Sequence, residues 1–393
     1  MDRFRFVKSF LPHNMKRQVR ELFISTTLVN LALALVMIFE PIYLYQTGHP
    51  LQKIMFFYLI TYALYFILMP LGGQFARRKG YELGMLVGTF LFIAYYITLF
   101  LIGQYDFLFY IAPIILALQK TFYWPAYHAD FAHFSDSAEE GREVSAMNVA
   151  SSLVYIIGPA IAGFIIFTWG YGALFIVASI LFLGSNIATL VTKEEFTPHD
   201  FSYRKVYTDL FSKKNRNDFF AYIGYGEELV VLVVWPVFIS IIIADVFDLG
   251  LIVALATLIT TLVTLYIGKL TDSRNKRKIL SLGSVFYSLA WFIRIFISNT
   301  IGVFFVDTMS KLGKNTISIP LMAITYEKAK DKRETEDSHI MHSVVFFEMS
   351  LVVGKLIAIL AIYIAMFFIT DEVFAFKLTF ILAGSMSLLY MLL

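Results

Sequence analysis

Apolar runs of about 20 residues follow one another along almost the entire chain, and each is long enough to cross a lipid bilayer. The sequence has 393 residues, of which 59% are hydrophobic and 16% are charged. Soluble proteins carry about 25% charged residues. The runs are continuous, whereas the strands of a membrane barrel alternate apolar and polar residues. The sequence therefore predicts an all-α polytopic membrane protein.

We count twelve spans, centred near residues 34, 64, 92, 118, 156, 182, 230, 259, 288, 313, 352 and 382. The links after the first, third and fifth spans are very short, whereas the links after even-numbered spans are longer and charged. Of the 32 Lys and Arg residues, 25 lie on the basic N-terminal tail or on these charged links, and only Lys53 lies clearly on the opposite side. The positive-inside rule predicts that both termini are cytoplasmic. No cleavable signal peptide is expected, because the tail lacks an apolar core.

One sizeable polar segment divides the chain into two halves. The predicted organisation is a cytoplasmic tail (1–20), a six-helix bundle (21–192), a cytoplasmic linker (193–217) and a second six-helix bundle (218–393). Within the linker, "YRKVYTDLF" is predicted to form an amphipathic helix on the membrane surface.

The two halves repeat. Three pairs of landmark residues, 195, 195 and 196 positions apart, are Gly73 with Gly268, Pro125 with Pro320, and Gly158 with Gly354. A nearly constant offset predicts two pseudo-symmetric bundles related along the membrane normal.

The loops after the second and eighth spans resemble the loop motif of the major facilitator superfamily of secondary transporters, roughly G-x-L-A-D-R-x-G-R-K. The copy after the eighth span keeps Gly268, Leu270, Asp272, Lys276 and Arg277. The copy after the second span keeps Gly73, Ala76, Arg78 and Gly80, but has Arg77 where the family has Asp. The resemblance implies a conformational latch in the second copy, and a basic loop that only sets the topology is the alternative.

The fifth span contains "IIGPAIAG", which resembles a motif that the family's exporters carry, G-x-x-x-G-P-x-x-G-G. Gly158, Pro159 and Gly163 match it, whereas Val154 and Ala162 replace two glycines. The resemblance favours export, and a plain helix-packing role is the alternative.

Charged residues inside a membrane are costly and mark functional sites. The family plan implies that spans 1, 4, 7 and 10 line a central cavity, flanked by spans 2, 5, 8 and 11. Nine charges fall on these inner or flanking spans: Glu40, Lys120, Glu227, Glu228, Asp307, Lys311, Lys314, Glu348 and Lys355. The outer spans carry Arg294 and Lys377, which are both expected to extend toward the outer membrane surface.

Two lysines are assigned to substrate binding. Asp307 and Lys311 are predicted to pair, because they are four residues apart on one helix, and this leaves Lys314 available to a substrate. Lys120, near the centre of the fourth span, roughly corresponds to Lys314 across the pseudo-symmetry, with an offset of one residue when Pro125 and Pro320 are aligned. The lysines suggest an anionic or zwitterionic substrate, but the five acids leave a cationic one open.

Proton coupling or charge relay is assigned to Glu227, Glu228, Asp307, Lys311, Glu348, Lys355 and Glu40. Adjacent residues on a helix point about 100° apart, so only one of Glu227 and Glu228 is expected to face the cavity centre. For Glu348 and Lys355 the alternative is a role in helix packing, and for Glu40 it is a gate.

Aromatic residues on cavity-lining spans can form a wall for an organic substrate, and this role is assigned to Tyr123, Trp124 and Trp235, with core packing as the alternative. His128, Asp130 and His133 do not make a metal site, because the two histidines are five residues apart and do not share a helix face. No metal or cofactor is predicted. No enzyme motif and no phosphate-binding loop is found, so neither catalysis nor direct drive by ATP is expected.

These observations predict a proton-coupled secondary active transporter that moves a small organic solute by alternating access, with export favoured. The expected partners are this solute, protons and membrane lipids, with no nucleic acid, and the chain is expected to act as a monomer in the plasma membrane. The alternatives are an uptake symporter, a non-transporting receptor or scaffold, and a lipid flippase.

Overall fold

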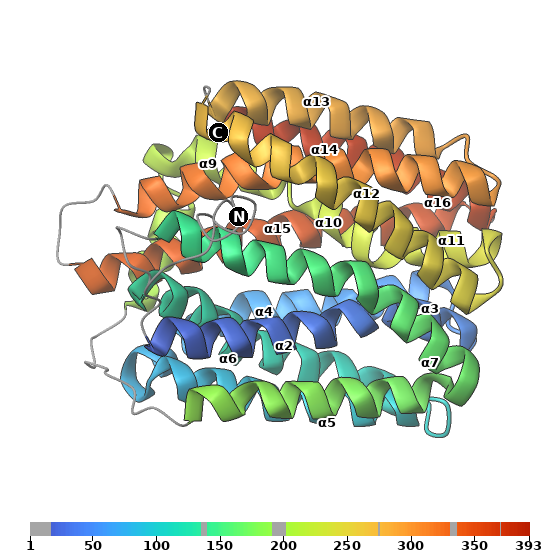
Figure 1. Cartoon of the computed structure of the whole chain (residues 1–393), viewed down its shortest axis with the longest axis horizontal. Helices are drawn as coiled ribbons and strands as arrows, with labels where there is room; N and C mark the ends of the chain where they lie inside the picture. The colour runs from blue at the N-terminus through green and yellow to red at the C-terminus, as the bar shows by residue number, and fades with distance from the viewer. Residues whose placement is uncertain (1–16, 135–139, 191–201, 274–275, 331–335, 370) are drawn as a thin grey trace, which may run out of the picture.

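The computed structural model describes residues 17–134, 140–190, 202–273, 276–330, 336–369 and 371–393. All regular secondary structure in these ranges is helical. Seven stretches of the described residues are long and apolar enough to cross a membrane. The helices run side by side along the long axis of the molecule (Figure 1). The predicted all-α polytopic fold is confirmed.

The helices of the N-terminal half follow the first six predicted spans in order. They are α2 (Arg17–Val36) with α3 (Phe39–Gln46), α4 (Leu51–Lys79), α5 (Tyr81–Leu101), α6 (Leu108–Phe134) and the two parts of α7 (Glu140–Leu190). Gly170 divides α7, with a φ of 80° that glycine adopts without steric cost. The predicted link "TWGYG" is therefore a sharp bend between two spans.

The C-terminal half begins with a span built from four short pieces. They are α9 (Arg216–Ile223), α10 (Gly226–Leu229), a π-helical turn (Val230–Val234) and α11 (Trp235–Ile242). Pro236 lacks a backbone N–H and so removes one bond of a regular α-helix here. The remaining elements are α12 (Val246–Ser273), α13 (Lys276–Arg294), α14 (Thr300–Lys330), α15 (Glu336–Phe368) and α16 (Glu372–Ser387), followed by a 3₁₀ turn (Leu388–Leu392).

The predicted linker helix is present as α8 (Tyr203–Leu210). Ser202 caps its first turn by accepting a hydrogen bond from the backbone N–H of Lys205. Val206 and Leu210 are buried on one face, where α8 packs against α15. Because Tyr203 also donates a hydrogen bond to Gln74 of α4, the linker helix contacts both halves.

Counterpart glycines set the same helix contact in both halves. A Cβ atom on Gly158 of α7 would lie 2.6 Å from the Cβ of Ala34 on α2. A Cβ atom on Gly354 of α15 would lie 2.2 Å from the carbonyl oxygen of Ile223 on α9. Spans 5 and 1 therefore touch as spans 11 and 7 do, as a repeat predicts.

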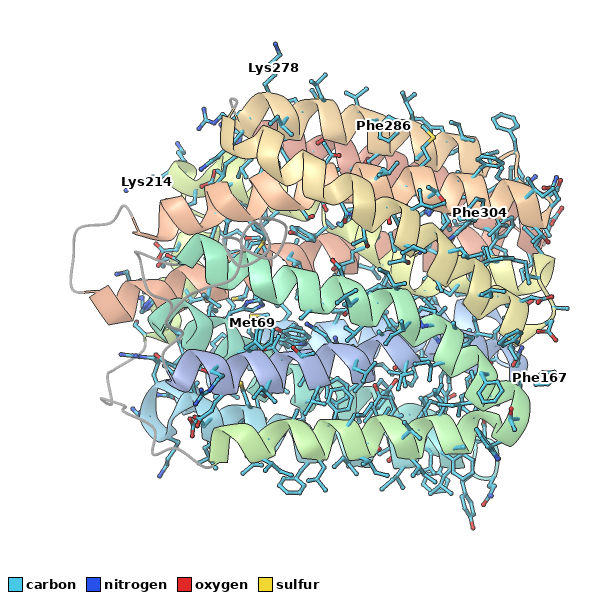
Figure 2. All side chains as sticks on the ribbon, in the orientation of Figure 1. Met69, Phe167, Lys214, Lys278, Phe286 and Phe304 are labelled. Carbon is cyan, nitrogen blue, oxygen red and sulfur yellow. The ribbon has the colours of Figure 1, made fainter. Side chains whose placement is uncertain are left out.

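The most extensive contacts between the halves, within the described residues, are those of α7 with α12 and of α4 with α15. The start of α2 and the C-terminal residues lie toward the same end of the molecule (Figure 1), which we call the terminal end. Figure 2 shows Lys214 and Lys278 at this end and Phe286 on the flank. Phe286 is exposed, as expected for a side chain that faces lipid.

Candidate functional site

Glu227 and Lys314 form an ion pair inside the C-terminal half. The Glu227 side chain is 0% exposed. Its Oε2 accepts a hydrogen bond from the Tyr287 hydroxyl at 2.6 Å, and its Oε1 accepts one from Tyr390 at 3.0 Å. Lys314 also lies 4.8 Å from the centroid of the Tyr225 ring. The substrate lysine that the sequence left unpaired therefore has a resident carboxylate.

Glu228 points away from Glu227, to the junction of the two halves. Its Oε2 lies 2.7 Å from Nζ of Lys355 on α15. Nζ of Lys355 lies 5.1 Å from the ring centroid of Tyr62, which belongs to α4 in the N-terminal half. The two adjacent carboxylates therefore have different partners, and which of them faces a central cavity stays a prediction.

Lys120 of α6 reaches the same aromatic ring. Its Nζ lies 5.6 Å from the ring centroid of Tyr62. In the part of the chain that the structure describes, no carboxylate oxygen lies within 4 Å of this ammonium. The nearby Glu40 of α3 accepts a hydrogen bond from the Tyr58 hydroxyl at 2.8 Å. Lys120 is thus a partly buried cation without a direct counterion.

Glu348 of α15 connects the halves. Its Oε1 lies 3.3 Å from Nε2 of His128 on α6, and its Oε2 accepts a hydrogen bond from Tyr65 of α4 at 3.2 Å. The His128 ring stacks on Trp124 at a centroid distance of 5.8 Å. A carboxylate of one half is therefore held by side chains of the other.

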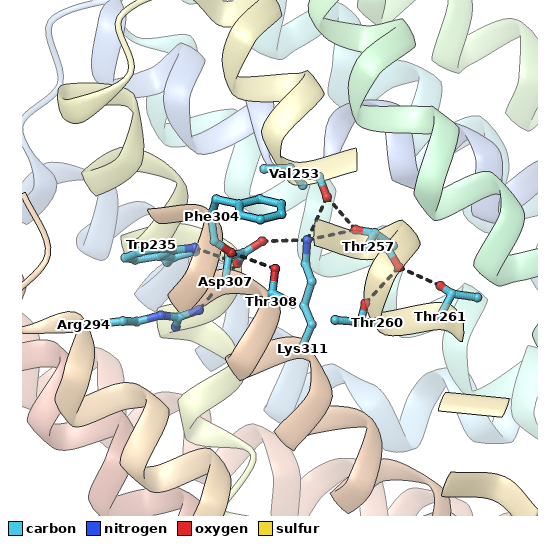
Figure 3. A network of polar contacts seen from close by, with 10 residues as sticks. All are labelled: Trp235, Val253, Thr257, Thr260, Thr261, Arg294, Phe304, Asp307, Thr308 and Lys311. Atoms are coloured by element: carbon cyan, nitrogen blue, oxygen red, sulfur yellow. Dashed lines mark hydrogen bonds and ion pairs between the residues drawn. The ribbon is translucent and has the colours of Figure 1, made fainter. Parts of the chain in front are cut away.

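Asp307 of α14 lies at the centre of a polar network (Figure 3). Its Oδ2 is 2.7 Å from Nζ of Lys311, which confirms the predicted pair. Its Oδ1 accepts a hydrogen bond from Nε1 of Trp235 at 3.1 Å and lies 3.7 Å from Nη2 of Arg294.

The prediction that Arg294 extends toward the membrane surface is wrong. Its side chain is 1% exposed, and its guanidinium lies 4.0 Å from the ring centroid of Trp235 and 3.8 Å from that of Trp291. Cation–π contacts with two tryptophan rings, together with the attraction of Asp307, offset the loss of hydration. Trp291, one turn before Arg294 on α13, was the signal in the sequence.

The three assigned aromatic residues lie in different surroundings. Tyr123 is buried, and its Cβ would lie 2.7 Å from a Cβ added to Gly88. Trp124 is half-buried beside His128, whereas Trp235 is buried with its indole N–H used by Asp307. Their substrate contacts stay predictions.

The loop after α4 differs from the family pattern in its contacts as well as in its sequence. Gly73 and Gly80 are buried, and Arg78 is exposed. Arg77, at the family's Asp position, is also buried and donates a hydrogen bond to the Tyr81 hydroxyl at 2.7 Å. A buried cation therefore replaces the family's anion at this position.

The second loop motif lies partly outside the described residues. The structure does not describe the side-chain surroundings of Gly268 and Asp272 in α12. Arg277 on α13 is exposed. The latch in this half stays a prediction.

The fifth-span motif packs tightly against both neighbours. Beyond the contact of Gly158 with α2, a Cβ on Gly163 would lie 2.7 Å from the carbonyl oxygen of Val246 on α12. A Cβ on Gly250 of α12 would lie 2.3 Å from the carbonyl oxygen of Pro159. The motif therefore forms a close contact between the two halves.

The comparisons with known proteins agree with this architecture. The family model for the Major Facilitator Superfamily matches residues 22–226. The uncharacterized protein YqgE of Bacillus subtilis (strain 168) is 22% identical over 356 residues, which cover 88% of this chain and 82% of that protein. A crystal structure of a POT family transporter in complex with a thioalcohol-conjugated peptide shares the fold, with a TM-score of 0.74 at 12% identity, over 98% of this chain and 97% of the other. The family model matches more than half of the length of this chain, and the chain therefore belongs to the major facilitator superfamily.

Proposed function

We propose that this protein is a secondary active transporter that moves a small organic solute with an anionic group by alternating access between its two halves. We also propose that transport of this solute is coupled to protons and that its direction is export. The observation that carries it is the contrast between Lys120 and the other lysines assigned to the site, each of which contacts a carboxylate.

An unpaired ammonium in a low-dielectric environment attracts an anion strongly. Lys120 lies on α6 near the junction of the halves, where its ammonium and that of Lys355 approach the ring of Tyr62. Glu228 neutralises Lys355 directly, but Lys120 receives only longer-range attraction from Glu40 and Glu228. A carboxylate or phosphate group of a substrate would supply the direct counterion that Lys120 lacks among the described residues.

The Glu228–Lys355 pair supports proton coupling. A proton on Glu228 would cancel its attraction for Lys355 and change the charge that Lys120 and the substrate experience. Protonation can then bias the equilibrium between inward-facing and outward-facing states. Glu227 is less accessible for this role, because its side chain is 0% exposed and is held by Lys314 and two tyrosines.

Alternating access requires contacts between the halves that break and re-form. The contact of Glu348 with His128 and Tyr65 is one candidate, and the close packing of α7 on α12 is another. The fifth-span motif supports export, and the distribution of Lys and Arg supports a cell-membrane protein with both termini in the cytoplasm.

The first experiment measures thermal unfolding of the purified protein against a panel of organic anions, cations and zwitterions at two pH values. A ligand of the folded state raises the melting temperature by mass action. We expect anions or zwitterions to do so, and Lys120→Met to weaken their binding about 10–100-fold, the equivalent of about 1.5–3 kcal/mol for a charge-assisted contact. Lys377→Met, on the outer helix α16, is the matched control and should bind as the wild type does.

Flux in proteoliposomes tests coupling and direction. A proton gradient should drive the identified solute outward, and Glu228→Gln should abolish the response to the gradient. Inward flux would show that the protein is an uptake symporter and not an exporter. If lipophilic cations raise the melting temperature and Glu228→Gln abolishes this rise, the substrate is a cation and not an anion. Binding by no member of the panel, with no flux, would favour a receptor, a scaffold or a lipid flippase.

A further inference from the structure

The ammonium group of Lys311 is surrounded by oxygens of three kinds. Its Nζ lies 2.7 Å from the carboxylate Oδ2 of Asp307, 2.9 Å from the hydroxyl Oγ1 of Thr257 and 3.1 Å from the main-chain oxygen of Val253 (Figure 3). One oxygen comes from α14 and two come from α12. Carboxylate, hydroxyl and carbonyl oxygens are also the ligands of hard metal cations in proteins.

The oxygens are positioned by groups other than Lys311. The Thr257 hydroxyl donates its own hydrogen to the oxygen of Val253 at 2.7 Å, so its lone pairs are left to face the ammonium. Asp307 is held through Oδ1 by the indole of Trp235 and by Arg294. This support directs Oδ2 toward the place that the ammonium occupies.

The contact between Oδ2 of Asp307 and Lys311 is an ion pair. Oδ2 is buried, and it lies 2.7 Å from the ammonium nitrogen. The electrostatic attraction between the two charges depends on their distance and not on the direction of one N–H bond. A spherical cation would interact with these oxygens in the same way.

We propose that the side chain of Lys311 fills a binding site for a monovalent cation, formed by Asp307, Thr257 and Val253. In the wild-type protein the ammonium group of Lys311 is the cation that occupies this site. The contact between α12 and α14 therefore needs no external ion. This inference goes beyond the proposed function and does not depend on it.

The charge and the distances select the cation. The site has one carboxylate, and the neighbouring Arg294 already supplies a positive charge, so a second unit of charge would be repelled. Calcium takes 6–8 oxygens at about 2.3–2.6 Å, which is closer than the 2.7–3.1 Å found here. A potassium ion and an ammonium ion have similar sizes, and both fit without rearrangement.

The test removes the built-in cation and adds a free one. Wild type, Lys311→Ala and Lys311→Met are unfolded thermally in potassium, sodium, methylammonium or choline chloride at equal ionic strength. In Lys311→Ala, potassium and methylammonium should raise the melting temperature by about 2–4 °C relative to choline, which is too large for the site. Wild type and Lys311→Met should show no such shift, because a side chain fills the space in both.

A further variant shows where the cation binds. The double variant Asp307→Asn/Lys311→Ala should lose the shift, because the site then has no carboxylate. If the Lys311→Ala variant can be purified in a folded state only in potassium or methylammonium chloride, transfer into choline chloride should unfold it. Equal melting temperatures of Lys311→Ala in all four salts would overturn the proposal. A shift of the same size in the wild type, or one that persists in the double variant, would also overturn it.

Discussion

The N-terminal half carries two of the nine intramembrane charges, Glu40 and Lys120, whereas the C-terminal half carries seven. In the C-terminal half each lysine of this set contacts a carboxylate: Lys311 with Asp307, Lys314 with Glu227, and Lys355 with Glu228. In the N-terminal half tyrosines take the place of counterions, because Tyr58 donates to Glu40 and the ring of Tyr62 faces Lys120.

A tyrosine compensates the two charges unequally. A hydroxyl donor stabilises a carboxylate directly, and such a hydrogen bond contributes about 1.5–3 kcal/mol. An aromatic ring contributes about 0.5–2 kcal/mol to a cation. Each of these three lysines of the C-terminal half thus has a carboxylate partner, whereas the N-terminal half leaves one ammonium incompletely compensated. For this reason we propose Lys120 as the residue that binds the charged group of the substrate.

The largest effect should come from breaking the most buried pair. Glu227→Ala leaves the Lys314 ammonium without its carboxylate and should destabilise the protein by about 3–5 kcal/mol. The lower end of this range is expected, because the Lys314 side chain is 24% exposed and can be partly hydrated. Thermal or denaturant unfolding measures the loss. Glu227→Ala/Lys314→Met should recover part of it, and a double variant as unstable as the sum of both single variants would argue against a direct pair.

Substitution of the counterpart glycines should destabilise the two halves equally, whereas the compensation of charges differs between them. Gly158→Ala and Gly354→Ala should each cost about 1–3 kcal/mol, because each Cβ would overlap a neighbouring helix. Gly184→Ala is the control, since a Cβ there meets no atom within 4 Å, and it should be neutral or stabilising by up to about 1 kcal/mol. Unfolding of the three variants is compared. A tolerated Gly354→Ala beside a costly Gly158→Ala would show that the packing is not symmetric.

The smallest effect is expected at the exposed contact between the halves. Tyr45 donates a hydrogen bond to Oε2 of Glu372 at 3.0 Å in an exposed position. Tyr45→Phe should cost less than about 1 kcal/mol, because water can replace the bond. Tyr65→Phe should cost more, since its acceptor, Glu348, is buried. Equal losses of stability in the two variants would mean that burial does not separate these contacts.

Hydropathy predicted the order of the spans because membrane insertion depends on local composition. The pair of Asp307 and Lys311 was also predictable, because both partners lie on one helix and four residues fix their separation. The nearly constant offset between landmark residues predicted that the two halves repeat, and the close helix contacts at Gly158 and Gly354 agree with this. The linker helix followed from its amphipathic pattern in the same way.

Pairs between helices were not predictable, because they depend on how each helix is rotated about its axis. The sequence left Lys314 unpaired, although Glu227 of another span is its counterion. The position of Arg294 near a helix end suggested hydration; Trp291 on the same helix was a signal against it, but the contact with Trp235 depends on the packing of another helix. The partnership of His128 with Glu348 likewise joins residues 220 positions apart.

The most direct test compares two lysines that approach the same ring. Lys355→Met and Lys120→Met are unfolded thermally in the absence of any added ligand. Our account predicts that Lys355→Met lowers the melting temperature, because Glu228 is left unpaired, whereas Lys120→Met leaves it unchanged or raises it. Equal destabilisation by the two substitutions would show that Lys120 has a resident counterion. That result would contradict the assignment of the substrate anion to Lys120.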